Sequence, residues 1–301
     1  MKKKICLFFV CVTALILVAA QDFNPVAMAS YKNGEPFLLK GDGEHDPYNE
    51  ATGNRIFIDE NGIIYIYSFD RDTTYELNNY NISKEYKYDF SEFDGLAGLS
   101  RVTSRYFYYK WTASSCIAID RATGERVFDV RLNDLFCARN YYYDEKTDLL
   151  FFIDKDKNLY CVEHPSLDQK ENRLNLKNNE ETLALLRSGK YAPHILIDEN
   201  NTIEIENKKI GPQFEYSPIG KYSYRIYSTN VAVYEDMTKT PVTRILYNNI
   251  RGSETNESVA LHPCGDIYIL RYDSTKKLHT LYCVQNTWDS AWRNEWFKTH
   301  R

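Results

Sequence analysis

Apolar residues in this chain fall into short runs that are separated by short polar segments. Residues 56–67 show the pattern, because an apolar run leads into Asp59-Glu60-Asn61-Gly62 and out into a second apolar run. Asp, Asn and Gly tolerate positive φ angles, and Asp and Asn also bond to their own backbone, as a tight turn requires. Short apolar runs bounded by such residues are typical of β-strands. The pattern predicts a β-hairpin here.

The same hairpin pattern recurs along the chain. Residues 58–66 (IDENGIIYI) match residues 197–205 (IDENNTIEI) at most positions, and residues 143–151 and 261–269 follow the same plan more loosely. A sequence that repeats one supersecondary unit predicts a repeat architecture, in which neighbouring units bury a shared core.

A second repeat lies outside the first. Residues 159–162 (LYCV) recur as residues 281–284 (LYCV), each one polar turn downstream of a hairpin. Apolar strand, turn, strand, turn and strand make three consecutive strands of a meander. Sheets of about four such strands, repeated about every 40 residues, are the blades of a β-propeller.

The pattern predicts an all-β propeller domain over residues 21–285. Six blades fit the spacing, within a range of five to seven, and residues 24–40 are candidates for a strand that closes the ring. The fifth unit, residues 222–247, is the least regular. The units begin near residues 53, 88, 133, 171, 211 and 249.

One segment inside the propeller departs from the strand pattern. Residues 179–188 read as a short helix, with Asn178 as a residue that can cap its start, Glu181 three positions on, and Gly189 at its end. The pattern therefore predicts a short inserted helix.

The tail, residues 286–301, carries Trp288, Trp292 and Trp296 at spacings of four. On a helix these side chains share one face. Amphipathic faces usually bury against their own domain, so we expect the tail to dock on the propeller. A helix that binds a partner is the alternative.

The first twenty residues have the pattern of a secretory signal peptide. Lys2, Lys3 and Lys4 precede an uncharged apolar run over residues 5–20, which ends in the small residues Ala19 and Ala20. We expect residues 1–20 to be cleaved, leaving an extracytoplasmic protein, periplasmic or secreted, without membrane insertion. An uncleaved anchor is the alternative, although the run is short for a spanning helix.

Charge and composition exclude two classes of binding partner. The chain has a formal net charge of −5, and loss of the three lysines makes the mature part more acidic. A mildly acidic surface without a basic block argues against nucleic acid and against anionic lipid as partners. The 25 Tyr and 15 Phe suit packing in pleated sheets, and clustered exposed tyrosines would instead form a recognition surface.

Two stretches resemble known propeller repeats. The hairpin over residues 56–67 is similar to the repeat of NHL-type six-bladed propellers, and residues 118–128 (AIDRATGERVF) resemble the quinoprotein-type repeat, with Phe128 where that repeat often has tryptophan. The resemblance implies the fold. It does not imply a reaction, because propellers host binding proteins, scaffolds and enzymes.

Five cysteines remain after the leader is removed. Their wide spacing contains no CxxC motif for zinc or redox chemistry, and an odd number leaves at least one without an intramolecular partner. Buried, unpaired cysteines that pack as small hydrophobic residues are the expectation. They are Cys116, Cys137, Cys161, Cys264 and Cys283.

The most acidic loop contains Asp42, Glu44 and Asp46. Alternating carboxylates are typical of calcium loops, but Pro47 stands where an EF-hand loop needs glycine. Residues 154–158 (DKDKN) also fail to match a calcium loop, because Leu159 follows them where the motif needs glycine. We expect solvated turns at both places, no metal site and no cofactor.

The sequence offers no catalytic motif. His194 beside a strand and His262 in a turn read as surface or strand-edge residues, and Ser114 and Ser115 lack a G-x-S-x-G elbow. No P-loop or dinucleotide fingerprint is present. Three segments fit the glycosylation sequon, beginning at Asn81, Asn200 and Asn256.

Two hypotheses about function follow. The first is an exported, non-catalytic module that binds a protein or small-molecule ligand, favoured by the lack of catalytic motifs. The second is a hydrolase or oxidoreductase whose site is assembled at the central channel from several blades. Convergence of three or more carboxylates or histidines at one mouth of the channel would favour the enzyme.

Overall fold

The computed structural model describes fifteen segments of the chain between residues 26 and 300. The described residues are 26–32, 54–68, 72–89, 98–110, 115–131, 140–153, 158–166, 180–205, 208–210, 221–226, 230–235, 238, 240–246, 255–273 and 278–300. The signal peptide expected over residues 1–20 lies outside them.

The described residues form six antiparallel sheets of three or four strands. The four-stranded sheets that come first are β2 (Arg55–Ile58), β3 (Ile64–Ser68), β4 (Thr73–Asn78) and β5 (Asn81–Lys87), then β6 (Gly98–Val102), β7 (Tyr106–Lys110), β8 (Ser115–Asp120) and β9 (Arg126–Arg131). The three-stranded sheets are β10 (Asn140–Asp144), β11 (Leu149–Ile153) and β12 (Leu159–Glu163); β13 (Ile195–Ile197), β14 (Ile203–Ile205) and β15 (Lys208–Ile210); and β16 (Tyr222–Ile226), β17 (Asn230–Glu235) and β18 (Thr243–Leu246).

The last sheet joins the two ends of the chain. It contains β19 (Thr255–Leu261), β20 (Ile267–Asp273) and β21 (Leu278–Val284), and β1 (Val26–Lys32) adds its outer strand. β1 runs antiparallel to β21, with Val26 opposite Cys283 and Lys32 opposite Leu278. The expectation that residues 24–40 supply a closing strand is confirmed. The hydrogen bonds between β1 and β21 close the ring by joining the two ends of the chain.

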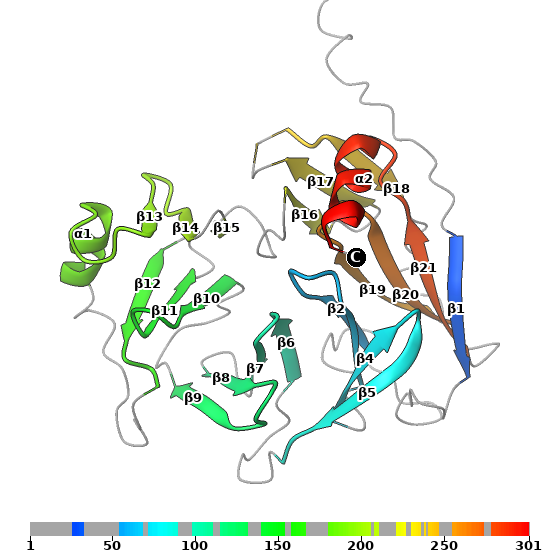
Figure 1. Ribbon diagram of the computed structural model, residues 1–301, viewed down its shortest axis with the longest axis horizontal. Helices are drawn as coiled ribbons and strands as arrows, with labels where there is room; N and C mark the ends of the chain where they lie inside the picture. Colours follow the sequence, from blue (N-terminus) through cyan, green and yellow to red (C-terminus); the bar gives the residue numbers. More distant parts are fainter. Residues whose placement is uncertain are drawn as a thin grey trace, which may run out of the picture.

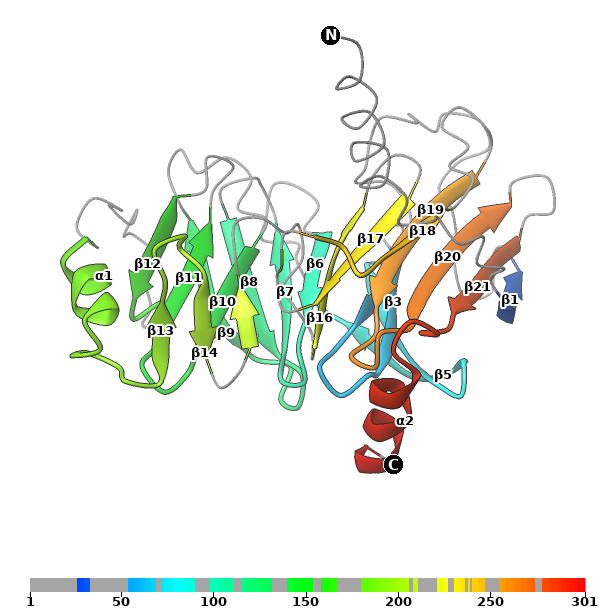
Figure 2. The same cartoon turned by 90° about the horizontal axis from the view of Figure 1, so that it is seen from above.

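The sheets stand around a common centre, as Figure 1 shows from one end and Figure 2 from the side. The fold is therefore an all-β propeller, with α1 (Glu180–Arg187) and α2 (Ser290–Thr299) as its helices in the described residues. The number of blades falls within the expected five to seven.

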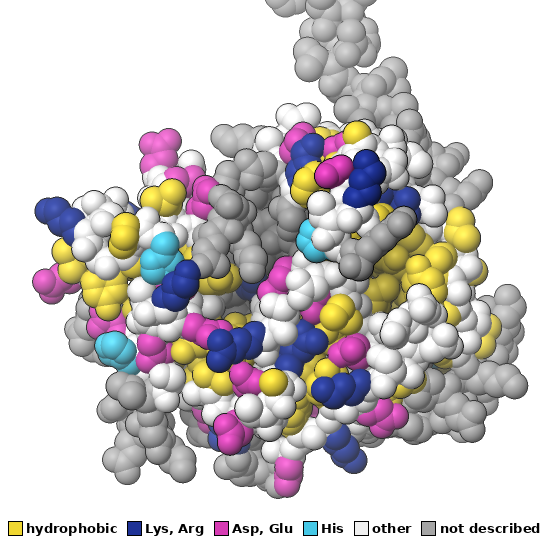
Figure 3. Space-filling view, viewed as in Figure 1, with side chains coloured by type: hydrophobic (Ala, Val, Ile, Leu, Met, Phe, Trp, Pro, Cys, Tyr) yellow, Lys and Arg dark blue, Asp and Glu magenta, His cyan; other side chains and the backbone are white. Residues whose placement is uncertain are grey.

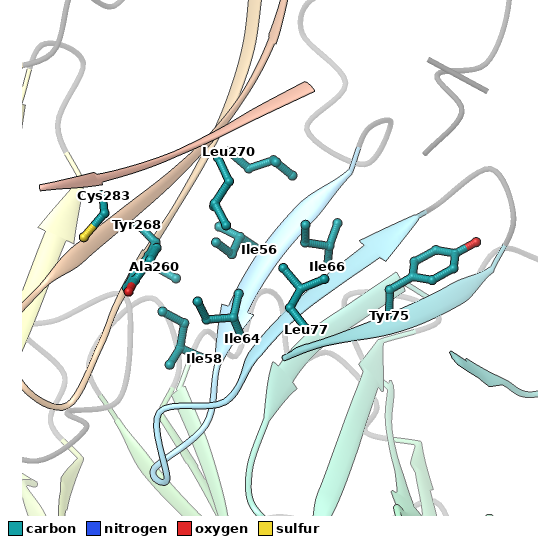
Figure 4. Close-up of a cluster of buried hydrophobic side chains, with 11 residues drawn as sticks. Ile56, Ile58, Ile64, Ile66, Tyr75, Leu77, Ala260, Tyr268, Leu270 and Cys283 are labelled. Atoms are coloured by element: carbon teal, nitrogen blue, oxygen red, sulfur yellow. The ribbon is translucent and has the colours of Figure 1, made fainter. Parts of the chain in front are cut away.

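Neighbouring sheets pack face to face, so that most strands are covered on both sides. β3 and β11 are buried at every position, which explains why their sequences, IYIYS and LLFFI, do not alternate between apolar and polar residues. Figure 4 shows one such core, in which Ile56, Ile66 and Leu77 face Ala260 and Leu270 of the closing sheet. Burial of each large apolar side chain contributes about 1.5–3 kcal/mol.

The predicted hairpin turns are present. In the β2–β3 turn, Asp59 Oδ1 accepts hydrogen bonds from the backbone N–H groups of Asn61 (3.0 Å) and Ile63 (2.9 Å), and Gly62 has a φ of +79°. In the β13–β14 turn, Asp198 Oδ1 accepts in the same way from Asn200 and Thr202. The recurring Asp is therefore a turn-forming residue, since its carboxylate substitutes for missing backbone partners.

The two predicted helices are also present, with one correction. α1 ends at Arg187, before Gly189 with a φ of +68°, as expected; Asn178 lies outside the described residues. α2 begins at Ser290, so Trp288 precedes the helix and does not share its face as predicted. Asp289 accepts a hydrogen bond from Trp292 N (3.1 Å) and fixes the start of the helix there.

Among the described residues, no helix has the length and apolar character needed to cross a membrane.

Candidate functional site

The hairpin turns 59–63, 103–105, 121–125, 145–148 and 262–266 lie at one end of the ring together with α2, and we call this end the turn face (Figure 2). Charged side chains on this face bond from one blade to the next. A site assembled from several blades would therefore lie on the turn face. The contacts below show which of its charged groups hold the blades together and which are accessible to a ligand.

The first cluster joins the β2–β5 and β6–β9 sheets. Arg121 Nη1 donates to Asp59 Oδ2 (3.0 Å) and to the carbonyl oxygen of Thr103 (2.7 Å). The Tyr65 hydroxyl accepts from Arg121 Nη2 and donates to Asp59 Oδ2 (3.1 Å), and the guanidinium lies 4.8 Å from the centre of the Tyr65 ring. Asp59 is fully buried, and burial raises the pKa of its carboxyl, an effect that Arg121 opposes.

Further polar contacts on the turn face involve Ser104 and Arg105 of the β6–β7 turn. Ser104 donates to Glu60 through its backbone N–H (2.9 Å) and its hydroxyl (2.5 Å). Arg105 Nη1 donates to Glu145 of the next blade, and its Nε donates to Asp120 (3.3 Å). The Ser104–Glu60 and Arg105–Glu145 contacts join neighbouring blades, and because they are exposed to solvent they add little stability.

The third contact pairs a histidine with a carboxylate. His194 Nε2 lies 3.0 Å from Asp144 Oδ2, which also accepts from the Thr147 hydroxyl (2.5 Å). The side chain of His194 is 28% exposed and that of Asp144 is 6% exposed. An accessible imidazole oriented by a buried carboxylate is the arrangement of a general base, so this pair is the best-placed catalytic candidate on the face. The sequence did not indicate it.

The fourth cluster lies under α2. His262 Nδ1 accepts from the backbone N–H of Cys264 (3.1 Å), and the Cys264 sulfur lies 2.9 Å from the same nitrogen. Because Nδ1 accepts the Cys264 N–H, the neutral imidazole carries its proton on Nε2. His262 is 4% exposed, because Trp296 and Phe297 cover it, and burial lowers its pKa to about 4. The prediction of a surface or strand-edge histidine is wrong here.

Asp266 anchors α2 to the closing sheet. Arg293 donates to it twice, from Nε to Oδ1 (2.7 Å) and from Nη2 to Oδ2 (3.0 Å), and Asn286 N donates to Oδ1 (2.7 Å). Asp266 is 1% exposed. A second anchor is Asp289, which accepts from Lys221 Nζ (2.7 Å) and the Tyr222 hydroxyl (2.6 Å) of the β16–β18 blade. The helix thereby bridges two blades.

The surroundings of the described cysteines do not activate their thiols. Cys116, Cys161, Cys264 and Cys283 are buried and none of them forms a disulfide, in agreement with the packing expectation. Burial raises the pKa of the Cys161 and Cys264 thiols and raises that of Cys283 to about 12. A reactive thiol needs a lowered pKa and access to solvent, so none of these three is an activated nucleophile. Cys137 lies outside the described residues.

Other candidates fall in part outside the described residues. These are the acidic loop with Asp42, Glu44 and Asp46, the turn residues Asp154 and Asp156, and the side chains of Ser114, Ser115 and Asn256. Of the sequon residues, Asn81 and Asn200 are exposed. Within the described segments, no group of three or more His, Cys, Asp or Glu side chains is arranged to hold a metal ion.

An exposed apolar surface lies at the rim of the ring, on α1 and β13, and the segment that joins them carries His194. Leu185 on α1 (38% exposed), Tyr191 (42%) and Leu196 on β13 (56%) account for three of the five large hydrophobic residues that are exposed in the described part. Figure 3 shows hydrophobic side chains at the left-hand rim, where Figure 1 places α1 and β13. We call these three residues, with the exposed face of α1, the α1 surface.

The two buried histidines predict acid sensitivity. Burial lowers the pKa of His262 and of His279 from 6.5 to about 4, and Asn54 Nδ2 lies 2.9 Å from His279 Nε2. Below about pH 6.5 the unfolded chain binds protons that the folded chain does not, so stability is lost as pH falls toward about 4. We expect urea unfolding midpoints to fall over this window. The slope should flatten in a His262→Gln/His279→Gln variant; an unchanged slope would contradict the assignment.

Comparison with known proteins gives similarity to solved structures alone. No family model matches the chain, and no curated protein matches it. The glutaminyl cyclase of Myxococcus xanthus is 13% identical, with 88% of this chain and 98% of that chain covered and a TM-score of 0.38. The WD40 β-propeller domain of Doa1 is 9% identical, with coverages of 79% and 81% and a TM-score of 0.38. Virginiamycin B lyase from Staphylococcus aureus is 14% identical, with coverages of 77% and 85% and a TM-score of 0.33.

Proposed function

We propose that this protein is an exported, non-catalytic interaction module, in which a β-propeller presents the α1 surface to a protein partner outside the cytoplasm. The observation that carries the proposal is that three of the five exposed large hydrophobic side chains of the described part, Leu185, Tyr191 and Leu196, fall within residues 185–196, on α1, on β13 and between them. Exposed aromatic and aliphatic side chains that lie together mark interaction sites, whereas single exposed apolar residues are ordinary.

The turn face supports the same proposal. Asp59 and Asp266 are buried against arginines, and Cys264 is a neutral thiol covered by α2. Groups held in this way position blades and helix, and they cannot reach a ligand without unfolding the contacts that fix them. These buried groups therefore act as a structural framework.

Leu196 is the position from which to test the partner. A photo-crosslinking phenylalanine analogue at residue 196 should yield one discrete adduct in the exported fraction of the source organism. The same analogue at Lys84, which is exposed on the outer strand β5, is the matched control and should not yield it. The same adducts from both positions, or none from residue 196, would contradict the proposal.

A second candidate function rests on His194 and Asp144. If this pair is a general base, the protein hydrolyses a ligand bound on the turn face, and His194→Gln should lower turnover by about 100-fold. Screening ester, peptide and glycoside substrates with the wild type and this variant tests it. Turnover that depends on His194 would replace the interaction module by a hydrolase.

Export has its own test. Because the leader has a charged start and ends in Ala19 and Ala20, we expect the mature protein to begin at Gln21. N-terminal sequencing of the protein from the extracytoplasmic fraction checks this. Recovery of the chain in membranes with its leader attached would show an anchor instead.

A further inference from the structure

The outward face of α1 has a composition that fits a close helix contact. Glu181, Ala184, Leu185 and Ser188 lie at spacings of three and four and are exposed, while Thr182, Leu183 and Leu186 point into the core. Ala184 and Ser188 are small, so a second helix can approach the backbone beside Leu185. The stripe is apolar at its centre and acidic at its first turn.

Charge is divided between the two ends of this surface. Glu180 and Glu181 lie at the start of α1, and Arg187 lies in its last turn. Lys190 follows, and its backbone N–H donates to the carbonyl oxygen of Leu185 (3.1 Å), so that the chain turns back beside the centre of the stripe. Leu185 thus stands between an acidic and a basic end, four residues after Glu181 and five before Lys190.

We propose that the partner at the α1 surface is a second copy of this chain, a proposal that rests on the interaction function given above. Two α1 helices packed antiparallel about a two-fold axis at Leu185 place Glu181 of each copy beside Lys190 of the other. An interface of this kind must be complementary to itself, and a surface with opposite charges on either side of an apolar centre meets that requirement. Tyr191 follows Lys190 directly, and Leu196 lies on β13, which packs against α1.

The geometry of the ring allows this contact. α1 lies at the outer rim (Figure 1), and its buried residues face β11–β14 of its own two blades. Pairing two copies at the rim leaves α2 and the turns it covers outside the contact. A dimer would also present any other ligand-binding surface twice, which increases apparent affinity for a multivalent ligand.

The test is sedimentation velocity of the purified mature protein over a range of concentrations. We expect a reversible monomer–dimer equilibrium. Leu185→Lys should abolish it, because two like charges would then meet at the axis. Glu181→Lys and Lys190→Glu should each weaken it by about tenfold, since each change places like charges together. The double variant Glu181→Lys/Lys190→Glu should restore it, and Lys84→Glu on β5 should leave it unchanged.

The charge swap guards against variants that merely unfold, because a misfolded single variant would not regain dimerisation on a second substitution. A monomer at every concentration overturns the proposal, as does a dimer that persists in Leu185→Lys or that the charge swap does not restore. A monomer that still gives a crosslinked adduct to a different protein from residue 196 would overturn self-association and leave the interaction function standing.

Discussion

Gly62→Ala is expected to lower the free energy of unfolding by about 2–5 kcal/mol, through backbone strain and overpacking together. Gly62 has a φ of +79°, a conformation that residues with a side chain adopt at a cost. A Cβ there would lie 2.4 Å from His262 Nε2 and 2.6 Å from Trp296 Cη2. The β2–β3 turn, the β19–β20 turn and α2 meet at this point, so the added Cβ would displace His262, Trp296 or the turn itself. Urea unfolding of the variant measures the loss.

Gly189→Ala is the matched control. Gly189 also has a positive φ, +68°, but a Cβ there would have no atom within 4 Å. Its substitution should therefore cost about 1–2 kcal/mol, from backbone strain alone. Equal losses at Gly62 and Gly189 would show that the packing of His262 and Trp296 on the β2–β3 turn contributes nothing.

Arg293→Ala is expected to lower stability by about 3–5 kcal/mol, because it leaves the Asp266 carboxylate buried without its cation. Trp296→Ala should cost a similar amount, since Trp296 is 6% exposed and covers His262. Deletion of residues 286–301 removes both contacts and should be more harmful than either substitution. Thermal and urea unfolding measure all three.

Glu295→Ala is the control, because it changes the solvent-exposed face of the same helix. Its side chain is 60% exposed and pairs at 3.6 Å with Lys298, so the variant should be nearly as stable as the wild type. If the truncated chain kept its stability but lost the adduct at residue 196, the tail would be a recognition element. Docking would then be the wrong account of α2.

Much of the fold could be predicted because its signals are local. The Asp-Glu-Asn turns, the apolar strands and the glycine after α1 each act within a few residues, and each appears where the sequence places it. The closing strand was also predictable, since residues 24–40 precede the first repeat and were available to close the ring. The error at Trp288 has a local cause as well: Asp289 caps the helix one residue later than the tryptophan spacing implied.

The turn-face contacts could not be predicted in the same way. Asp266 and Arg293 are 27 residues apart, and Asp144 and His194 are 50 residues apart. No periodicity links such partners, because they meet through the closure of the ring and not through any one element. His262 looked like a turn residue for the same reason, since the tail that buries it follows later in the chain. The recurring Asp was the available signal: Asp59 and Asp198 both hold their own turns, and Asp59 also binds Arg121 of the neighbouring blade.

The most direct measurement of the account's central claim compares two variants by crosslinking through residue 196. Leu185→Lys changes the α1 surface and leaves the turn face intact, while His194→Gln removes the only accessible histidine that pairs with a buried carboxylate among the described residues. If the protein is an interaction module of the rim, the adduct is lost in Leu185→Lys and kept at the wild-type yield in His194→Gln. An adduct that survives Leu185→Lys and disappears in His194→Gln would place the function on the turn face and contradict the account.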